Sequence, residues 1–202
     1  MAQTVEEIRQ DENLTVGILK LFPRQGEWTE EDYFRLLPET NRIIELSEGR
    51  LIIAPAPTDQ HQKILGKLFL LIGNYVMSNN LGEFRCSPLD VRLWKDYIRQ
   101  PDIVFMSNEH KDRITEKYWG VPDLTMEILS ESTAKEDRKE KFYEYASAGV
   151  LEYWLVDPLI RSIEIFVLEK GAYVLFGKCG IGEIAKSRLL TGFEVNVGDI
   201  MA

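Results

Sequence analysis

Three acidic side chains lie inside apolar runs that are typical of β-strands. They are Glu45 in RIIELSEG, Asp102 in QPDIVF and Glu127 in PDLTMEIL. A buried carboxylate without a partner is strongly destabilising, so a sheet built from these runs must pair its acids with cations. We therefore expect the three acids to face one another around a divalent cation, with Lys141 supplying complementary positive charge.

Length and composition favour one large domain. The chain has 202 residues, of which 45% are hydrophobic, which is enough for a single core. We predict an N-terminal arm over residues 1–28 and one domain over residues 29–202. The sequence MAQTVEEIRQDENL lacks the basic and apolar regions of a secretory signal, and no apolar run is long enough to span a membrane. These features predict a cytoplasmic protein that does not engage membranes.

The net charge limits how the protein could bind nucleic acid, and the two cysteines limit which structural sites it could contain. A net charge of −9 argues against a surface that grips nucleic acid non-specifically, although a local basic groove is still compatible with it. Cys86 and Cys179 form no CxxC pair, and the chain has only two histidines. Both a zinc site and a disulfide scaffold are therefore disfavoured.

The pattern of apolar residues predicts an α/β fold of the α+β type, in which a mixed β-sheet is flanked by helices and followed by a strand meander. Thr58 is the expected N-cap of a long helix that ends at Asn79, and Thr133 with Glu136 matches a capping box for a second helix ending at Gly149. A short helix is expected over residues 29–37, where Pro38 stops it. The predicted strands are 43–46, 50–54, 83–86, 89–94, 102–106, 123–129, 151–157, 162–168 and 172–177.

Alternation along the run DLTMEIL places Glu127 on the less apolar face of its strand. Asp102 directly follows Pro101, where the backbone leaves a turn and a side chain can point into a cleft. If the two strands pair, directly opposed residues have Cβ atoms about 5 Å apart, which is close enough for a shared metal. The sequence alone leaves the register of that pairing open.

The chain resembles the PD-(D/E)XK nuclease superfamily and, within it, the Uma branch of restriction-endonuclease-like bacterial proteins. The resemblance covers residues 29–197. It rests on IELSEGRLI followed by PAPTDQHQ, on SPLDVRL, on QPDIVF, on PDLTMEILS and on DRKEKFYEYASAGVLEYWLVD, in the order and spacing of that branch. The implied fold is the mixed sheet of restriction endonucleases.

The resemblance also implies a set of site residues. Asp102 is similar to the Asp of the PD motif, Glu127 to the acid of the (D/E)XK element, and Glu45 to the upstream acid. The superfamily has a lysine two residues after the second acid, where this chain has Leu129. In the Uma branch the lysine lies on the following helix, which points to Lys141.

The implied activity is hydrolysis of phosphodiester bonds in DNA. Asp102 and Glu127 would hold Mg²⁺, for which Mn²⁺ can substitute, and the metal would activate water and stabilise charge on the phosphate. Lys141 would position that water or neutralise the phosphate, and Glu45 would orient water at the metal. A homodimer would cut both strands by symmetry, with the strands late in the chain as its interface.

Each of these residues also has a purely structural interpretation. Asp102 is compatible with a Pro-Asp turn, Glu127 with a salt bridge to Lys141, and Glu45 with an exposed hairpin position. Lys141 also fits a solvated helix face. Asp90 is a candidate for a supporting acid behind the site, or else an outward strand residue.

His61, in the first turn of the long helix, is a candidate for touching a phosphate or leaving group, or else has a surface or structural role. On the structural interpretation the chain is a catalytically silent binding or regulatory module that keeps the nuclease fold. A hydrolase of small phosphate esters is a third alternative, which no glycine-rich phosphate loop supports.

Overall fold

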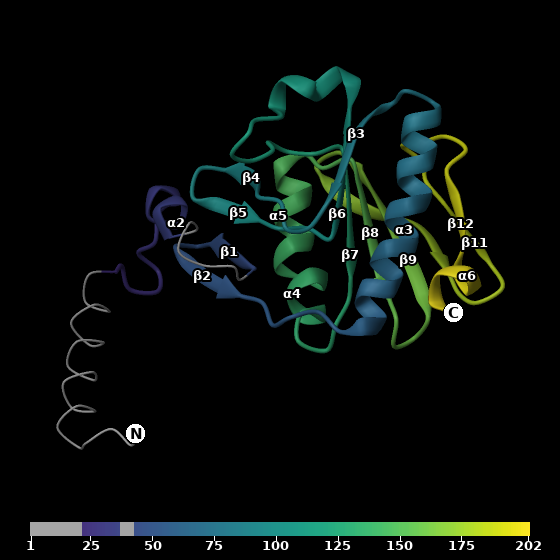
Figure 1. The fold of residues 1–202 in the computed structure, drawn as a ribbon, viewed down its shortest axis with the longest axis horizontal. Helices are drawn as coiled ribbons and strands as arrows, with labels where there is room; N and C mark the ends of the chain where they lie inside the picture. The colour runs from purple at the N-terminus through teal and green to yellow at the C-terminus, as the bar shows by residue number, and fades with distance from the viewer. Residues whose placement is uncertain (1–21, 37–42) are drawn as a thin grey trace, which may run out of the picture.

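A computed structural model of the chain describes residues 22–36 and 43–202 (Figure 1). Most of the predicted arm and the helix stop at Pro38 lie outside the described residues. Trp28, the last residue of that arm, is buried beside Tyr33 of the small helix α2 (Glu30–Leu36). Thr29 caps this helix as predicted, because its hydroxyl accepts the Asp32 N–H at 3.3 Å.

Six strands form the main sheet, in the order β10, β9, β8, β7, β6, β3. β7 and β8 are parallel, whereas the other neighbours are antiparallel. A parallel pair requires a crossover, and the helices α4 (Ala134–Arg138) and α5 (Glu140–Ala148) supply it between these two strands. The strands are β3 (Gly82–Cys86), β6 (Ile103–Ser107), β7 (Leu124–Ile128), β8 (Glu152–Asp157), β9 (Ser162–Glu169) and β10 (Ala172–Cys179).

Helices cover both faces of this sheet (Figure 1). The long helix α3 (Asp59–Ser78) packs on one face together with a C-terminal hairpin and helix, and Thr58 caps it as predicted by accepting the His61 N–H. None of the described helices is both long and apolar enough to cross a membrane. The C-terminal elements are β11 (Ile184–Lys186), β12 (Glu194–Asn196) and α6 (Val197–Met201).

The predicted alternation in β7 is confirmed. Met126 and Ile128 belong to the core beneath α3, whereas Leu129 packs with Tyr145 on the opposite face. Glu127 lies between the two α3-facing residues and therefore points toward α5 (Glu140–Ala148). The mixed sheet flanked by helices is thus confirmed.

A second, four-stranded sheet lies beside the first, in the order β2, β1, β5, β4 (Figure 1). The hairpin of β1 (Ile44–Ser47) and β2 (Arg50–Ile53) was predicted, as was β4 (Val91–Trp94). The strand β5 (Tyr97–Arg99) was not, because a strand of three residues carries too little periodicity. The short 3₁₀ helix η2 (Asn108–Arg113) was also missed.

The crossover helix differs from its prediction. Instead of one helix there are two, α4 (Ala134–Arg138) and α5, which are separated at Lys139 with φ −123° and ψ −77°. The predicted capping box was wrong, since the Thr133 hydroxyl makes no cap hydrogen bond and the Glu136 carboxylate contacts Arg99 instead. Gly149 does end α5 in the left-handed region, at φ 96°.

Candidate active site

The pairing of β6 with β7 brings two of the predicted acids together. Ile103 lies opposite Met126, so Asp102 and Glu127 are opposed one residue beyond this pair. The Asp102 N–H lies 3.4 Å from Glu127 Oε2. The register that the sequence left open therefore places both carboxylates at the same end of the strand pair.

Asp102 is held from one side only. Its Oδ2 accepts a hydrogen bond from the Ile128 N–H at 2.7 Å and lies 3.1 Å from His61 Nε2. Among the described residues no donor reaches Oδ1, and 15% of the side chain is exposed. One carboxylate oxygen is thus fixed by the protein, while the other has no protein donor among the described residues.

Glu127 meets the predicted lysine. Its Oε1 accepts hydrogen bonds from Lys141 Nζ at 3.0 Å and from the Tyr145 hydroxyl at 2.8 Å. The ammonium group also lies 3.1 Å from Glu45 Oε1 and 3.2 Å from Asp137 Oδ1. Three carboxylates therefore surround one buried cation, and Lys141 does not lie on a solvated helix face.

Glu45 is tied to the protein through both of its oxygens. Oε1 accepts the Gln100 N–H at 2.9 Å and Oε2 accepts from Arg99 Nη1 at 2.9 Å. Burial opposes ionisation, but the charges of Lys141 and Arg99 outweigh it and lower the pKa of Glu45 to about 2. The carboxylate is buried and ionised rather than exposed on a hairpin edge.

Arg99 is the principal residue that sequence analysis missed. It is 1% exposed and contacts, besides Glu45, the carboxylates of Glu136 at 2.5 Å and Glu144 at 2.6 Å. Glu45 lies on β1 of the four-stranded sheet, which we call the small sheet, whereas Glu136 lies on α4 and Glu144 on α5. Arg99 therefore links the small sheet to both crossover helices. Arg99 lies on β5, which at three residues is too short to show a pattern of apolar residues in the sequence.

Asp137 was missed as well, although its spacing of four residues before Lys141 is the usual distance for a helical ion pair. The break at Lys139 lets α4 and α5 direct both side chains inward, and Asp137 is 2% exposed. Burial raises its pKa, against the charge of Lys141.

Negative charge exceeds positive charge in the cavity above these residues, which has a volume of about 510 Å³. Lys141 is the one Lys or Arg among the described lining residues. Burial raises the pKa of Glu127 well above its usual range, and the charges of Asp137 and Asp102 add to this effect against the opposing charge of Lys141. A further cation in the cavity would relieve this imbalance. The six lining acids are Glu45, Asp102, Glu127, Glu131, Glu136 and Asp137.

The two supporting candidates have different positions. His61 lines the cavity against Asp102; burial opposes its protonation, but Asp102 outweighs this and raises the pKa of the imidazole. Asp90 is buried outside the cavity lining, where its Oδ1 accepts from the Tyr33 hydroxyl at 2.8 Å and from Gln100 Nε2 at 2.7 Å. It is therefore not an outward strand residue, and it supports Gln100 beside Glu45.

Comparisons with known proteins agree with this fold. A family model, Uma2, described as putative restriction endonuclease, matches residues 30–198. No curated protein matches the chain. Among solved structures, a putative nuclease belonging to DUF820 from Anabaena variabilis ATCC 29413 matches with a TM-score of 0.71 at 20% identity, over 86% of this chain and 97% of that one. At this identity the match shows a shared fold.

Proposed function

The chain belongs to the Uma2 family, described as putative restriction endonuclease, and from this premise we propose that it is a metal-dependent endonuclease of the PD-(D/E)XK superfamily that hydrolyses DNA. One observation carries the proposal. Asp102 and Glu127 meet at the same end of two paired strands, and Lys141 lies 3.0 Å from Glu127. Two acids that can hold a metal, with a lysine beside them, are suited to metal-assisted phosphodiester hydrolysis.

The oxygen atoms at the site fit Mg²⁺ or Mn²⁺. Among the described residues, no group of three or more His, Cys, Asp and Glu side chains is arranged to hold a metal. Mg²⁺ does not need one, because it commonly binds through one or two carboxylates, waters and substrate phosphate. Asp102 Oδ1 and Glu127 Oε2 make no strong hydrogen bond to the described part of the protein and are therefore available to a metal. When bound, the metal supplies an activated water and charge stabilisation at the phosphate.

Lys141 acts in this proposal as a fixed positive charge. Burial opposes its protonation, but Glu127, Glu45 and Asp137 outweigh this effect and raise its pKa well above the usual range. A side chain held as ammonium neutralises phosphate charge and does not accept a proton from water. Either role that the family resemblance implies is open to an ammonium group, which can donate a hydrogen bond to the water or neutralise the phosphate, whereas the role of general base is not.

Glu45 and His61 act as positioning residues. The resemblance implied that Glu45 orients water at the metal, yet its two oxygens are engaged by Lys141, Arg99 and Gln100. We assign it to holding Lys141 in place. His61, whose Nε2 lies 3.1 Å from Asp102 Oδ2, orients that carboxylate and leaves its second oxygen available to a metal.

The proposed DNA cleavage by a homodimer has a candidate interface at β10. This strand is the outer edge of the main sheet, and Val174, Leu175 and Phe176 are 47%, 51% and 47% exposed. An apolar edge strand can pair with the same strand of a second copy across a twofold axis. Sedimentation of wild type and Leu175→Lys would test this, with a monomeric wild type contradicting it. The cytoplasmic location remains a prediction.

Cleavage of plasmid and single-stranded DNA in Mg²⁺ or Mn²⁺ tests the proposed activity. Wild type should cut, and Asp102→Ala, Lys141→Ala and EDTA should each abolish cutting. Lys135→Ala is the matched control, since Lys135 is an exposed lysine of α4. Circular dichroism would verify that the variants fold. An inert wild type that also binds no cation in calorimetry would favour the silent binding module instead.

A further inference from the structure

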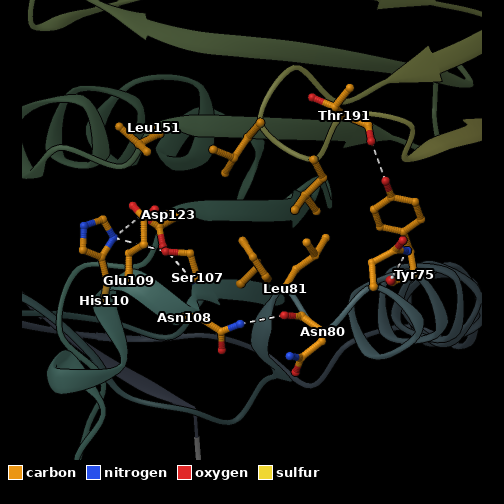
Figure 2. A pocket seen from close by; sticks show the side chains of 14 residues that line it. Tyr75, Asn80, Leu81, Ser107, Asn108, Glu109, His110, Asp123, Leu151 and Thr191 are labelled. Atoms are coloured by element: carbon orange, nitrogen blue, oxygen red, sulfur yellow. Dashed lines mark hydrogen bonds and ion pairs between the residues drawn. The ribbon is translucent and has the colours of Figure 1, made fainter.

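A second cavity lies at the opposite end of the β6 and β7 pair. Asp102 precedes β6 and Ser107 ends it, whereas Asp123 precedes β7 and Glu127 lies near its end. The antiparallel pairing therefore brings Ser107 and Asp123 together at the far end. The cavity there has a volume of about 660 Å³ and contains none of the residues assigned to the nuclease site (Figure 2).

An oriented imidazole lines one side of this cavity. Asp123, which is 2% exposed, accepts the Ser107 N–H at 2.7 Å through Oδ2, and its Oδ1 lies 2.6 Å from His110 Nδ1. Because an ionised carboxylate only accepts hydrogen bonds, Nδ1 must carry the proton. In the neutral imidazole, Nε2 then has a free lone pair and acts as an acceptor.

The other polar residues of the lining also favour a ligand that is positively charged and donates hydrogen bonds. Glu109 and Asp123 contribute carboxylates, and none of the described lining residues is Lys or Arg. The C-terminal end of α3 reaches the cavity through Asn79 and Asn80. That end of a helix is electronegative, and the last turn of α3 carries no basic side chain to compensate. Phosphate is therefore disfavoured here.

The floor of the cavity is apolar. Figure 2 shows His110 and Tyr75 at opposite sides with Leu81 between them. Leu151 and Phe105 also contribute to the lining. The Tyr75 hydroxyl donates to the Thr191 carbonyl at 2.5 Å, which fixes the ring at the edge of the cavity. A bound molecule would place an apolar body on this floor and its polar end against the acids.

We propose that this cavity binds an organic cation, in which an amidinium, guanidinium or ammonium group is carried on an apolar body. The negative charge of the lining favours a positively charged group, and the apolar side chains of the floor favour an apolar body that carries it. The site is separate from the proposed nuclease site, so it does not depend on catalytic activity. The ligand is either a free small molecule or the basic side chain of another protein.

Titration of the full chain with benzamidine, followed by ¹H–¹⁵N NMR, tests this proposal. Benzamidine should shift the amide signals of Ser107 and Asn108 and bind at least about tenfold more tightly than neutral benzamide, since a desolvated charged hydrogen bond contributes more than a neutral one. Benzoate should not bind. Equal affinity for benzamidine and benzamide, or shifts located elsewhere, would overturn the proposal.

Variants locate the charge that selects the cation. Glu109→Gln should weaken benzamidine binding by about threefold, and Asp123→Asn by more, while binding of benzamide stays unchanged. Glu116→Gln is the control, because Glu116 is an exposed acid outside the cavity. Should Glu109→Gln and Glu116→Gln bind benzamidine as the wild type does, the assigned site is wrong. The Glu109→Gln result keeps the test valid if Asp123→Asn fails to fold.

N-acetylarginine amide distinguishes the two sources of the cation. Tighter binding of the arginine derivative than of benzamidine would identify a side chain of a protein partner as the natural ligand. Tighter binding of benzamidine would identify a free aromatic cation. Failure of both to bind would refute the proposal, whatever the outcome of the DNA cleavage experiments.

Discussion

The two ends of the β6 and β7 pair carry the same kind of acid in different electrostatic surroundings. At one end Glu127 lies beside buried Lys141, which also pairs with Glu45, and Glu45 pairs in turn with buried Arg99. At the other end Asp123 has a single ionisable partner, His110. The flanking elements cause the difference, since α5 and β5 bring Lys141 and Arg99 whereas α3 and η2 bring hydrogen-bond acceptors. One strand pair can therefore support two unlike sites.

The largest expected difference between the two ends is catalytic. Asp102→Asn should reduce DNA cleavage by about a thousandfold, because it removes charge at the reacting centre. Asp123→Asn, the same change at the other end, should leave cleavage within about threefold of wild type. Initial rates on plasmid DNA in Mg²⁺ would measure both. Similar losses in the two variants would show that the ends are not functionally distinct.

The second difference is in stability. Lys141→Met should lower the free energy of unfolding by about 3–5 kcal/mol, because removal of this ammonium leaves three buried carboxylates without it. Lys178→Met removes a lysine that pairs with Glu164 but is 52% exposed, and it should cost less than about 1 kcal/mol. Urea denaturation at neutral pH would compare them. Equal costs would contradict the view that the buried network needs its lysine.

The third difference depends on pH. The pKa of Glu45 is about 2 in the folded chain, below its ordinary 4.5, so the stabilisation it provides is present above pH 4.5 and lost as pH falls toward 2. It amounts to about 3 kcal/mol. Unfolding of wild type and Glu45→Gln should therefore differ most near neutral pH and converge in acid. A gap that stays constant from pH 5 to pH 2 would disprove the assignment.

The smallest expected effect is at the far end. His110→Gln should lower the free energy of unfolding by about 1–2 kcal/mol, since Asp123 keeps the Ser107 N–H as a donor. DNA cleavage should not change. Thermal unfolding followed by circular dichroism would measure the loss. A cost as large as that of Lys141→Met would mean that the two ends depend equally on the hydrogen-bond partners of their acids.

The acids of the proposed nuclease site could be predicted because an acid inside an apolar strand is itself a signal. Glu127 needed a partner, and Lys141 on the next helix was available. Arg99 could not be predicted, because nothing in a three-residue strand separates it from a surface residue. The break at Lys139 was also hidden, since lysine favours helices and the break depends on the packing of both flanking segments.

The second cavity gave no sequence signal for a different reason. His110 and Asp123 are ordinary residues beside turns, and they are 13 positions apart. Only the antiparallel register of β6 and β7 brings Asp123 to the end of the strand that precedes His110. The main strands, by contrast, were predicted because each one carries its own apolar pattern.

The contacts that join the small sheet to α5 have a consequence for the order of folding. Ser47 and Glu144, whose side chains meet at 2.7 Å, are 97 positions apart, so this junction closes a long loop. Until it closes, the charges of Arg99 and Glu144 remain hydrated, and docking must strip that water at the same time as it forms the ion pairs. We therefore expect docking of the small sheet to be a late and slow step of folding, after the main sheet has formed, and to slow further at high salt.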